Sequence, residues 1–237
     1  MKPGRVARSP GSRKLPKLWR RIHKWLGLVV GLQFVLWALS GSVMAMLDSD
    51  KVGGHSAAPV ATIARTWPAD LIPPPAGAGI KGLTLRRIVD RPVYEIRDRQ
   101  GMRIVDARSG QRVLIDAALA QQIARDAFHQ RSAIASVERL ARPNFEARDH
   151  AGAMWRVNFR DEENSSSYVS ADTGRALVNR GDTWRVWDIA WMLHNMDYAN
   201  RTSFNHPLII LMTFAAMWLS FSGVYLLFIS FRPRSSK

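Results

Sequence analysis

The chain has 237 residues, nine of them tryptophan and none of them cysteine, and its formal net charge at pH 7 is +15. Without thiols it can form no disulfide, no iron–sulfur cluster and no covalent c-type haem attachment. A net positive charge of this size is typical of nucleic-acid-binding proteins. Here, however, the basic residues concentrate at the chain ends beside apolar segments, where they serve membrane topology and contact anionic lipids. We therefore exclude nucleic acid as a partner.

Two long uncharged segments dominate the chain. A basic tail at residues 1–24 holds nine Lys or Arg and no acid, and it precedes an apolar run at residues 25–47. A second run covers residues 207–231 and is followed by a short basic tail at 232–237. At about 1.5 Å per residue both runs are long enough, as helices, to cross a bilayer core of about 30 Å. Positive charge beside a span marks its cytoplasmic end. We predict an inner-membrane protein with both termini in the cytoplasm and residues 48–206 in the periplasm.

The region between the spans contains an internal repeat. After a linker at residues 48–61, residues 62–180 show two similar stretches whose Ser-Gly and Thr-Gly turns end at Gly110 and Gly174. Glycine at these positions predicts a positive φ that closes each turn. Alternating apolar residues predict strands at residues 83–85, 93–97, 103–105, 135–140, 154–160 and 167–170. Helices are expected at residues 60–67 and, capped by Asp116, at residues 117–130. The predicted fold is an α+β membrane protein in which two transmembrane helices flank two units of one helix and a three-stranded antiparallel sheet.

The repeat and its flanks resemble a known family. The repeated unit is similar to the PepSY domain. Its first copy, at residues 94–110, reads Tyr-x-Ile followed by Val-Asp-Ala-x-Ser-Gly, and its second copy lies at residues 155–174. The motifs HKWLGL at residues 23–28 and WMLHNMDY at residues 191–198 resemble the PepSY-associated transmembrane family. Members of that family include haem-bearing reductases that act on ferric siderophores at the periplasmic face. The resemblance therefore implies b-type haem and electron transfer.

His23 is the first candidate haem ligand. Residues four apart share one face of a helix, so His23, Gly27 and Gly31 align, and the glycines leave space for a flat macrocycle beside the imidazole. The alternative is that the two glycines form a helix-packing groove and that His23 only lies at the membrane interface.

His194 and His206 are the second and third candidates. Trp184, Trp187, Trp191, His194 and Tyr198 fall on one stripe of a predicted amphipathic helix, and residues 181–206 are expected to form this interfacial helix and a turn. An aromatic wall of Trp187, Trp191 and Tyr198 suits a haem edge, although an interfacial anchor explains the stripe equally well. His206 stands in Asn205-His206-Pro207, which predicts a helix start with Asn205 as its cap.

Topology divides these histidines. His194 and His206 are both predicted outside the membrane, and a chain reversal between them would bring them together, whereas His23 lies a bilayer thickness away. His23 therefore needs its second axial ligand from His23 of another subunit, related by two-fold symmetry. A homodimer would also restore the four helices of the reductases that this two-span chain resembles; another membrane redox partner is the alternative.

Two functions are compatible with the sequence. The first is haem-dependent electron transfer, with a ferric-siderophore-type reductase or an electron-transfer subunit as its enzyme class. The second is a membrane-tethered periplasmic PepSY module that binds and regulates a partner such as a peptidase, without a cofactor. No nucleotide-binding loop, zinc motif or hydrolytic triad occurs in the sequence.

Overall fold

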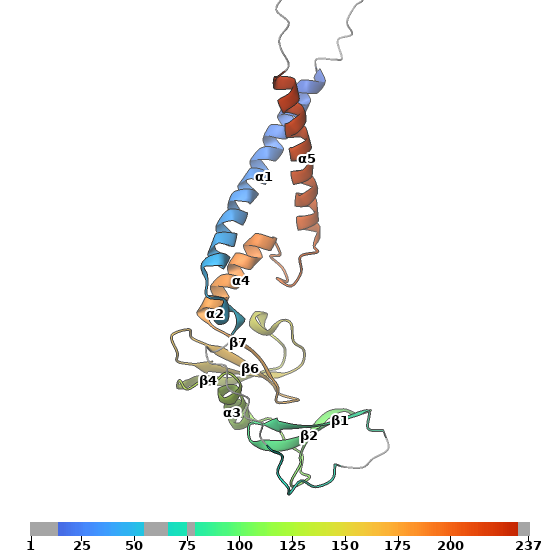
Figure 1. Cartoon of the computed structure of the whole chain (residues 1–237), viewed down its shortest axis with the longest axis vertical. Coiled ribbons are helices and arrows are strands. Elements are labelled where there is room, and N and C mark those ends of the chain that lie inside the picture. Colours follow the sequence, from blue (N-terminus) through green and yellow to red (C-terminus); the bar gives the residue numbers. More distant parts are fainter. Residues whose placement is uncertain (1–13, 55–65, 75–78, 232–237) are drawn as a thin grey trace, which may run out of the picture. The chain divides into compact units, whose positions relative to one another are not determined.

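The computed structural model describes residues 14–54, 66–74 and 79–231 and has the predicted α+β composition (Figure 1). It divides into two compact units. The first, here called the helical unit, comprises Met1–Met46 and Asp188–Lys237. The second, the sheet unit, comprises Leu47–Trp187. The predicted helix at residues 60–67 lies almost wholly outside the described residues.

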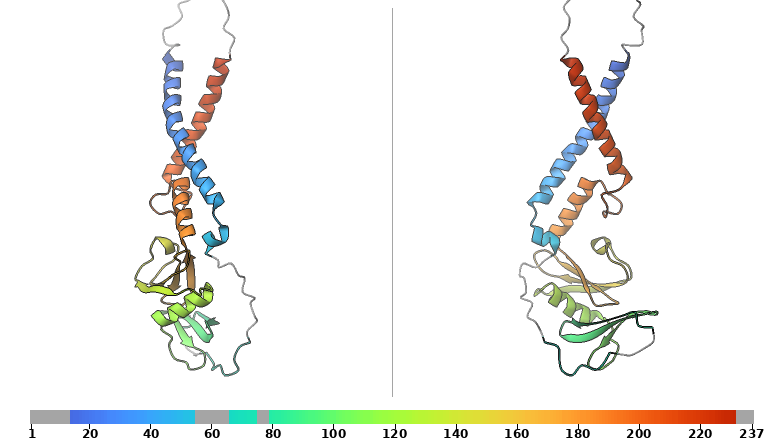
Figure 2. Two further views of the ribbon diagram at one scale, coloured as in Figure 1. Left: turned by 90° about the vertical axis from the view of Figure 1, so that its left-hand side faces the viewer. Right: turned by 45° about the vertical axis from the view of Figure 1, so that its right-hand side comes forward.

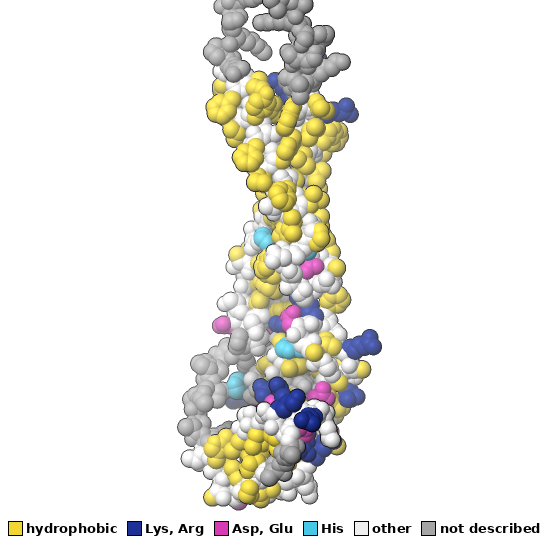
Figure 3. All heavy atoms as spheres, turned by 90° about the vertical axis from the view of Figure 1, so that its right-hand side faces the viewer, with side chains coloured by type: hydrophobic (Ala, Val, Ile, Leu, Met, Phe, Trp, Pro, Cys, Tyr) yellow, Lys and Arg dark blue, Asp and Glu magenta, His cyan; other side chains and the backbone are white. Residues whose placement is uncertain are grey.

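The helical unit is built on the two predicted apolar helices. Helix α1 runs Lys14–Met46 and α5 runs Pro207–Ser230, and both are long and apolar enough to cross a membrane. Their outer surfaces are covered by exposed hydrophobic side chains, drawn in yellow in Figure 3. The prediction that Asn205 caps α5 was wrong, because the cap lies one residue later. His206 occupies the cap position without a side-chain cap hydrogen bond, and Pro207 starts the first turn.

Helices α1 and α5 cross and pack against each other (Figure 2). Val30 of α1 and Met212 of α5 form a buried cluster together with Met196, which directly follows α4. Toward one end of the pair, the Trp19 ring stacks on the Trp218 ring with centroids 5.4 Å apart. The third helical element, α4, runs Asp182–Asn195, so only its second half belongs to this unit.

Two antiparallel sheets make up the sheet unit. The first has the order β1-β2-β3 and the second the order β4-β5-β6-β7. The strands run as follows: β1 Gly82–Ile88, β2 Arg91–Asp98, β3 Gly101–Asp106, β4 Ile134–Leu140, β5 Met154–Phe159, β6 Ser166–Ser170 and β7 Ala176–Arg180. All six predicted strands are present. The seventh, β7, was not predicted, and the expected linker contains the short helix α2 at Ser49–Gly53.

Helix α3, Ala117–Ala127, joins the sheets into one hydrophobic core, and as predicted its N-cap is Asp116. Its buried residues Ala120, Ile123 and Ala124 lie in a cluster with residues of both sheets, among them Ile88, Val93, Ile104, Val157, Phe159 and Val169. The α3 ribbon accordingly runs between the two sheets in Figure 2. Helix α3 is shorter than expected because the chain leaves helical geometry at Phe128 and His129 has φ +52°.

A buried carboxylate also connects the sheets. Glu95 on β2 accepts hydrogen bonds from Arg86 Nε at 2.7 Å and Arg175 Nη2 at 3.0 Å. Arg175 lies in the turn between β6 and β7, and Arg86 on β1 also donates to the carbonyl of Thr173 in that turn. Burial alone would raise the pKa of Glu95, but the hydrogen bonds from the two arginines outweigh it and leave this pKa below its usual range.

The two predicted glycine turns have the same geometry. Gly110 (φ +74°) donates its N–H to Asp106 O at 2.9 Å, and Gly174 (φ +64°) donates to Ser170 O at 2.9 Å. A second hydrogen bond closes each turn in the same way. Asp106 N donates to the carbonyl of Gln111, and Ser170 N donates to the carbonyl of Arg175. The positive φ expected at both glycines is therefore confirmed.

Candidate functional site

The three sequence-predicted site histidines lie in the helical unit, and each imidazole is fixed by one hydrogen bond. His23 contacts α5, His194 contacts α1, and His206 contacts the end of α4. These bonds decide which ring nitrogen remains available in each residue, because a neutral imidazole has one N–H donor and one acceptor nitrogen.

His23 rests on a serine–glycine pair of α5. Its Nδ1 lies 2.7 Å from Ser222 Oγ. A Cβ atom on Gly223 would come within 3.3 Å of His23 Cε1, so the absence of a side chain at Gly223 leaves room for the ring. Ser222 thus forms a hydrogen bond between the helices, whereas the side chain of Ser220 bonds, among the described residues, only to Ala216 O within its own helix.

His194 rests on a serine–glycine pair of α1 in the same manner. Its Nδ1 lies 3.2 Å from Ser40 Oγ, and a Cβ on Gly41 would come within 3.3 Å of His194 Cε1. His23 and Ser40 are 17 residues apart on α1, or about 25 Å along the helix axis. The two imidazoles therefore occupy equivalent settings near opposite ends of the helix pair.

Each serine already donates its single hydroxyl proton to its own helix. Ser222 Oγ donates to Leu219 O at 3.0 Å, and Ser40 Oγ donates to Leu36 O at 2.6 Å. Each hydroxyl must then accept the N–H of its histidine, so the proton of the neutral ring is on Nδ1 and the lone pair is on Nε2. Neither Nε2 has a hydrogen-bond partner in the described part of the chain. Histidines that ligate metals have this arrangement: one ring nitrogen donates a hydrogen bond to an oxygen, and the other nitrogen is available to the metal.

His206 is arranged differently. Its Nε2 lies 2.7 Å from Asn195 O, and because a carbonyl oxygen only accepts, Nε2 must carry the proton. The chain reversal brings His206 beside the last residue of α4. However, the bond uses its Nε2, and the residue joins the end of α4 to the start of α5.

The predicted aromatic stripe is divided between different surroundings. Trp184 is buried in the sheet unit, where the guanidinium groups of Arg180 and Arg148 lie over its ring. Trp191 packs edge-on against Phe204, with centroids 4.7 Å apart. Tyr198 is exposed and follows the end of α4. The expectation of one continuous stripe to Tyr198 was wrong, because the helix ends at Asn195 and Met196 has φ +57°.

The two candidate glycines of α1 also differ from each other. A Cβ on Gly27 would meet Leu219 Cδ1 of α5 at 3.6 Å, which is ordinary packing distance. A Cβ on Gly31 would meet nothing within 4 Å among the described residues. Gly27 thus faces the helix–helix contact, as the packing alternative expects, and Gly31 faces open space.

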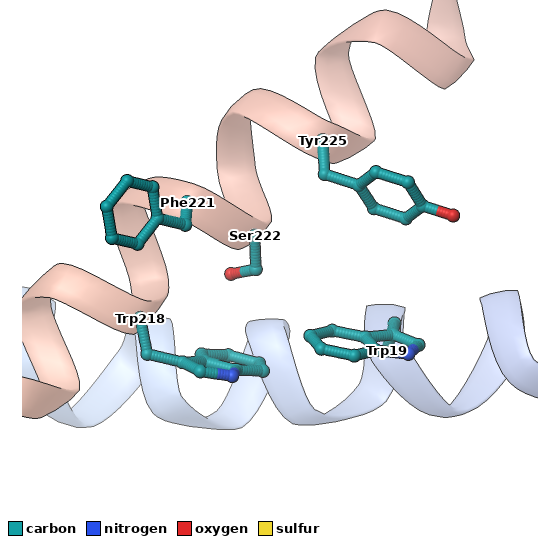
Figure 4. A pocket seen from close by; sticks show the side chains of 5 residues that line it. All are labelled: Trp19, Trp218, Phe221, Ser222 and Tyr225. Atoms are coloured by element: carbon teal, nitrogen blue, oxygen red, sulfur yellow. The ribbon is translucent and has the colours of Figure 1, made fainter.

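An aromatic pocket adjoins the partner of His23. It has a volume of about 300 Å³ and is lined by Trp19, Trp218, Phe221, Ser222 and Tyr225. Figure 4 shows the two indole rings along one side and the α5 side chains of Phe221, Ser222 and Tyr225 along the other. Ser222 is its one aliphatic hydroxyl, and the same oxygen holds His23.

Buried donors without partners lie near His194. Gln33 Nε2, Trp37 Nε1 and Asn195 Nδ2 have no hydrogen-bond partner within the described residues. Gln33, Trp37 and Ser40 follow one another at helical spacing on one face of α1, and Asn195 is the neighbour of His194. An unpaired buried donor costs about 1–3 kcal/mol, so this region is suited to an acceptor that the chain itself does not provide.

The turn after α4 is organised by one carboxylate. Asp197 accepts backbone N–H groups from Asn200 at 3.1 Å and from Thr202 at 2.9 Å, among others. Burial opposes ionisation of Asp197, but these backbone hydrogen bonds outweigh it and lower its pKa to about 2. Arg201 in the same turn donates to Asp188 of α4 at 2.7 Å. The turn that carries His206 is thus anchored to the helix that carries His194.

Comparison with protein families agrees with this architecture. The family model described as the PepSY-associated TM region matches residues 20–237. The chain belongs to the PepSY-associated transmembrane family. No curated protein and no solved structure matches it. As a PepSY-associated transmembrane protein it is a membrane protein, and the lipid bilayer contacts the exposed apolar surfaces of α1 and α5.

The residues of this PepSY-associated transmembrane protein fit a haem group at two of the three candidate histidines. His23 and His194 each present a free Nε2 beside a glycine, and buried donors near His194 could bind carboxylate groups such as haem propionates. His206 does not fit as an Nε2 ligand, because that atom already donates to Asn195.

Sequence reasoning missed the partners that orient these histidines. Ser40-Gly41 and Ser222-Gly223 are the same dipeptide inside two otherwise apolar runs. A hydroxyl beside a glycine in each span was the available signal for a polar contact between helices, but it does not identify a histidine as the partner.

Proposed function

We propose that this membrane protein binds b-type haem through His23 and His194 and transfers electrons in the inner membrane. In this proposal both termini are cytoplasmic, because the basic residues flank the spans on that side. His23 then lies toward the cytoplasmic face and His194 toward the periplasmic face.

The matching setting of the two histidines carries the proposal. Each ring is held through Nδ1 by a serine whose hydroxyl proton is already donated to its own helix. Nothing in ordinary helix packing requires the same serine–glycine pair to support a histidine at both ends of the bundle. An oriented imidazole with a free Nε2 is, in contrast, what an axial haem ligand needs.

Haem iron, when bound, supplies a one-electron ferric–ferrous couple whose potential depends on its axial ligands and on burial. The protein contributes the ring orientation, the tautomer and an environment that excludes water. A bis-histidine centre needs a second ligand on each side. Two-fold symmetry supplies it when two copies place their His23 residues, and likewise their His194 residues, opposite each other.

The sheet unit is proposed to consist of two PepSY-like copies. Besides the matching glycine turns, Ala107 N donates to Pro92 O at 2.9 Å and Ala171 N donates to Ala153 O at 3.0 Å. These bonds occupy corresponding places at the starts of β2 and β5. In the proposed orientation this unit lies in the periplasm, on the side where an electron acceptor would bind.

Absorbance spectroscopy tests the function. The full chain is purified in mild detergent from haem-replete cells and measured in its oxidised and reduced states. We expect a Soret band and split ferrous bands from the wild type. The variants His23→Ala and His194→Ala should each lose about half of the haem, and the double variant should lose all of it.

His206→Gln is the matched control. A glutamine side chain can still donate to Asn195 O, so the turn should be kept and the spectrum should not change. A colourless wild type, or a Soret band that survives the loss of both His23 and His194, would exclude the proposal. The protein would then be a tethered PepSY binding module without a cofactor.

A further inference from the structure

A second candidate site lies in the sheet unit, far in sequence from the histidines. It is a hollow of about 380 Å³ whose walls come from both sheets. Residues of β3 and of the segment that follows it form one side, and Arg139 of β4 and the turn after β6 form the other. The lining residues are Met102, Arg103, Ile104, Arg112, Val113, Leu114, Ile115, Arg139, Ala171 and Asp172.

Positive charge predominates in this hollow. Three arginines line it, and Asp172 is its one acid. Arg103 has a partner outside the lining, since its Nε lies 3.4 Å from an oxygen of Asp98. The side chains of Arg112 and Arg139, in contrast, make no hydrogen bond or ion pair with any residue that the structure describes. Elsewhere in this unit Arg86 and Arg185 are paired with acids at 2.6–2.7 Å.

The rest of the lining indicates the kind of anion. The side chain of Leu114 is 70% exposed although it is large and apolar, and it lies between Val113 and Ile115, whose own side chains are buried in the core. A ligand in the hollow would therefore meet guanidinium groups and one exposed aliphatic surface. Guanidinium groups bind carboxylates through two parallel hydrogen bonds, and the leucine suits a carbon skeleton.

We infer that the hollow between the two sheets, lined by Arg103, Arg112 and Arg139, binds a small organic anion with two or three carboxylates. The site is independent of haem, because none of its residues belongs to the helical unit. It gives the sheet unit a small-molecule ligand of its own. The three arginines outnumber the single acid of the lining, which favours the approach of such an anion.

Calorimetry on the full chain in detergent tests the inference, with citrate as the probe and constant ionic strength. We expect saturable binding to the wild type. Arg112→Gln and Arg139→Gln should each weaken it about tenfold or more, because each removes a charge-assisted hydrogen-bonding group. Arg142→Gln is the matched control, since Arg142 is an exposed arginine outside the hollow and its loss should change nothing.

Two other probes identify the ligand chemistry. Acetate has a single carboxylate and should bind at least tenfold more weakly than citrate, and inorganic phosphate separates recognition of a carbon skeleton from recognition of charge. Leu114→Ser should weaken citrate and leave phosphate unchanged. Equal citrate binding by wild type, Arg112→Gln and Arg139→Gln, or phosphate binding as tight as citrate binding, would overturn the inference. An unchanged circular dichroism spectrum shows that each variant is folded.

Discussion

At the scale of single residues, the hydroxyl group of Ser222 has a role that its neighbour Ser220 does not share. Both serines bond to a carbonyl of their own helix, but only Ser222 also contacts an imidazole. Polar side chains inside a membrane are often interhelical hydrogen-bond formers. Here that bond fixes which nitrogen of His23 carries the proton.

In Ser222→Ala, the proton of the neutral His23 ring should no longer be confined to Nδ1. In the haem-free protein, nitrogen-15 NMR of labelled histidine should show an unprotonated Nε2 at His23 in the wild type and a mixture of tautomers in the variant. Haem retention should fall about tenfold or more, as is usual when a group that orients a metal ligand is lost. Ser220→Ala should match the wild type in both measurements. The same His23 signals in Ser222→Ala and wild type would show that the hydroxyl does not set the tautomer.

Gly174 and Gly110 provide a second comparison between equivalent residues. Both have a left-handed backbone, which costs an alanine about 1–2 kcal/mol. A Cβ on Gly110 would meet Ile72 Cδ1 at 3.2 Å, at the end of one flexible side chain. A Cβ on Gly174 would meet three core isoleucines, with Ile115 Cδ1 at 2.8 Å. Overpacking of a core typically costs a further 1–3 kcal/mol or so.

Gly174→Ala should therefore lower the free energy of unfolding by about 2–5 kcal/mol and Gly110→Ala by about 1–2 kcal/mol. Denaturant unfolding of the full chain, followed by the fluorescence of the sheet unit's tryptophans, measures both. Equal losses in the two variants would mean that the core around Gly174 relaxes to accept a methyl group.

At the scale of elements, long periodic segments were predictable and short connections were not. The two spans, α3 and six strands could be predicted because their apolar periodicity extends over several residues. Strand β7 (Ala176–Arg180) contains Asn179 and lacks clear alternation, so only its pairing with β6 makes it a strand. Helix α2 is stabilised by its caps, Asp48 and Gly54. The end of α4 depends on the bonds of Asp197 and Arg201, which are tertiary contacts that a sequence pattern does not show.

The candidate site could also be predicted only in part: its histidines could be identified from the sequence, but their partners could not. Histidines in apolar surroundings are identifiable in a sequence, and His23 and His194 were identified in this way. Their serine partners lie 199 and 154 residues away along the chain. Such pairings appear only when the helices are placed side by side.

The turn between α4 and α5 should respond to acid through Asp197. Its pKa is about 2 in the folded protein, below the value of about 3.9 of an unperturbed aspartate. Its stabilising effect is therefore fully present above about pH 4 and is lost as the pH falls toward 2. Asp197→Asn should lower the melting temperature at neutral pH, and the difference from wild type should shrink as the pH is lowered from 5 to about 2.5.

Asp126→Asn is the control for this pH experiment, since Asp126 is exposed and outside the turn. Its melting temperature should follow that of the wild type throughout. A difference between Asp197→Asn and wild type that stays constant with pH would show that the carboxylate charge is not what organises the turn.

At the scale of the whole molecule, one chain provides one oriented Nε2 near each end of the helix pair. Gln33, Trp37 and Asn195 also leave buried donors unpaired within the described residues. In the proposed haem function each histidine would in addition need a second axial ligand. A closed two-fold dimer would supply the missing histidines with the same surface on both copies. It would also bring four apolar helices together.

The haem-loaded protein should therefore be a dimer, with twice the 26.7 kDa mass of one chain. Light scattering in detergent, corrected for the detergent, measures this mass, and the pyridine haemochrome assay gives the haem content. If wild-type and His23→Ala chains with different tags are co-expressed, the mixed dimers should lose the haem at the His23 end and keep the one at the His194 end. A haem-loaded monomer, or mixed dimers with full haem content, would contradict symmetric ligation.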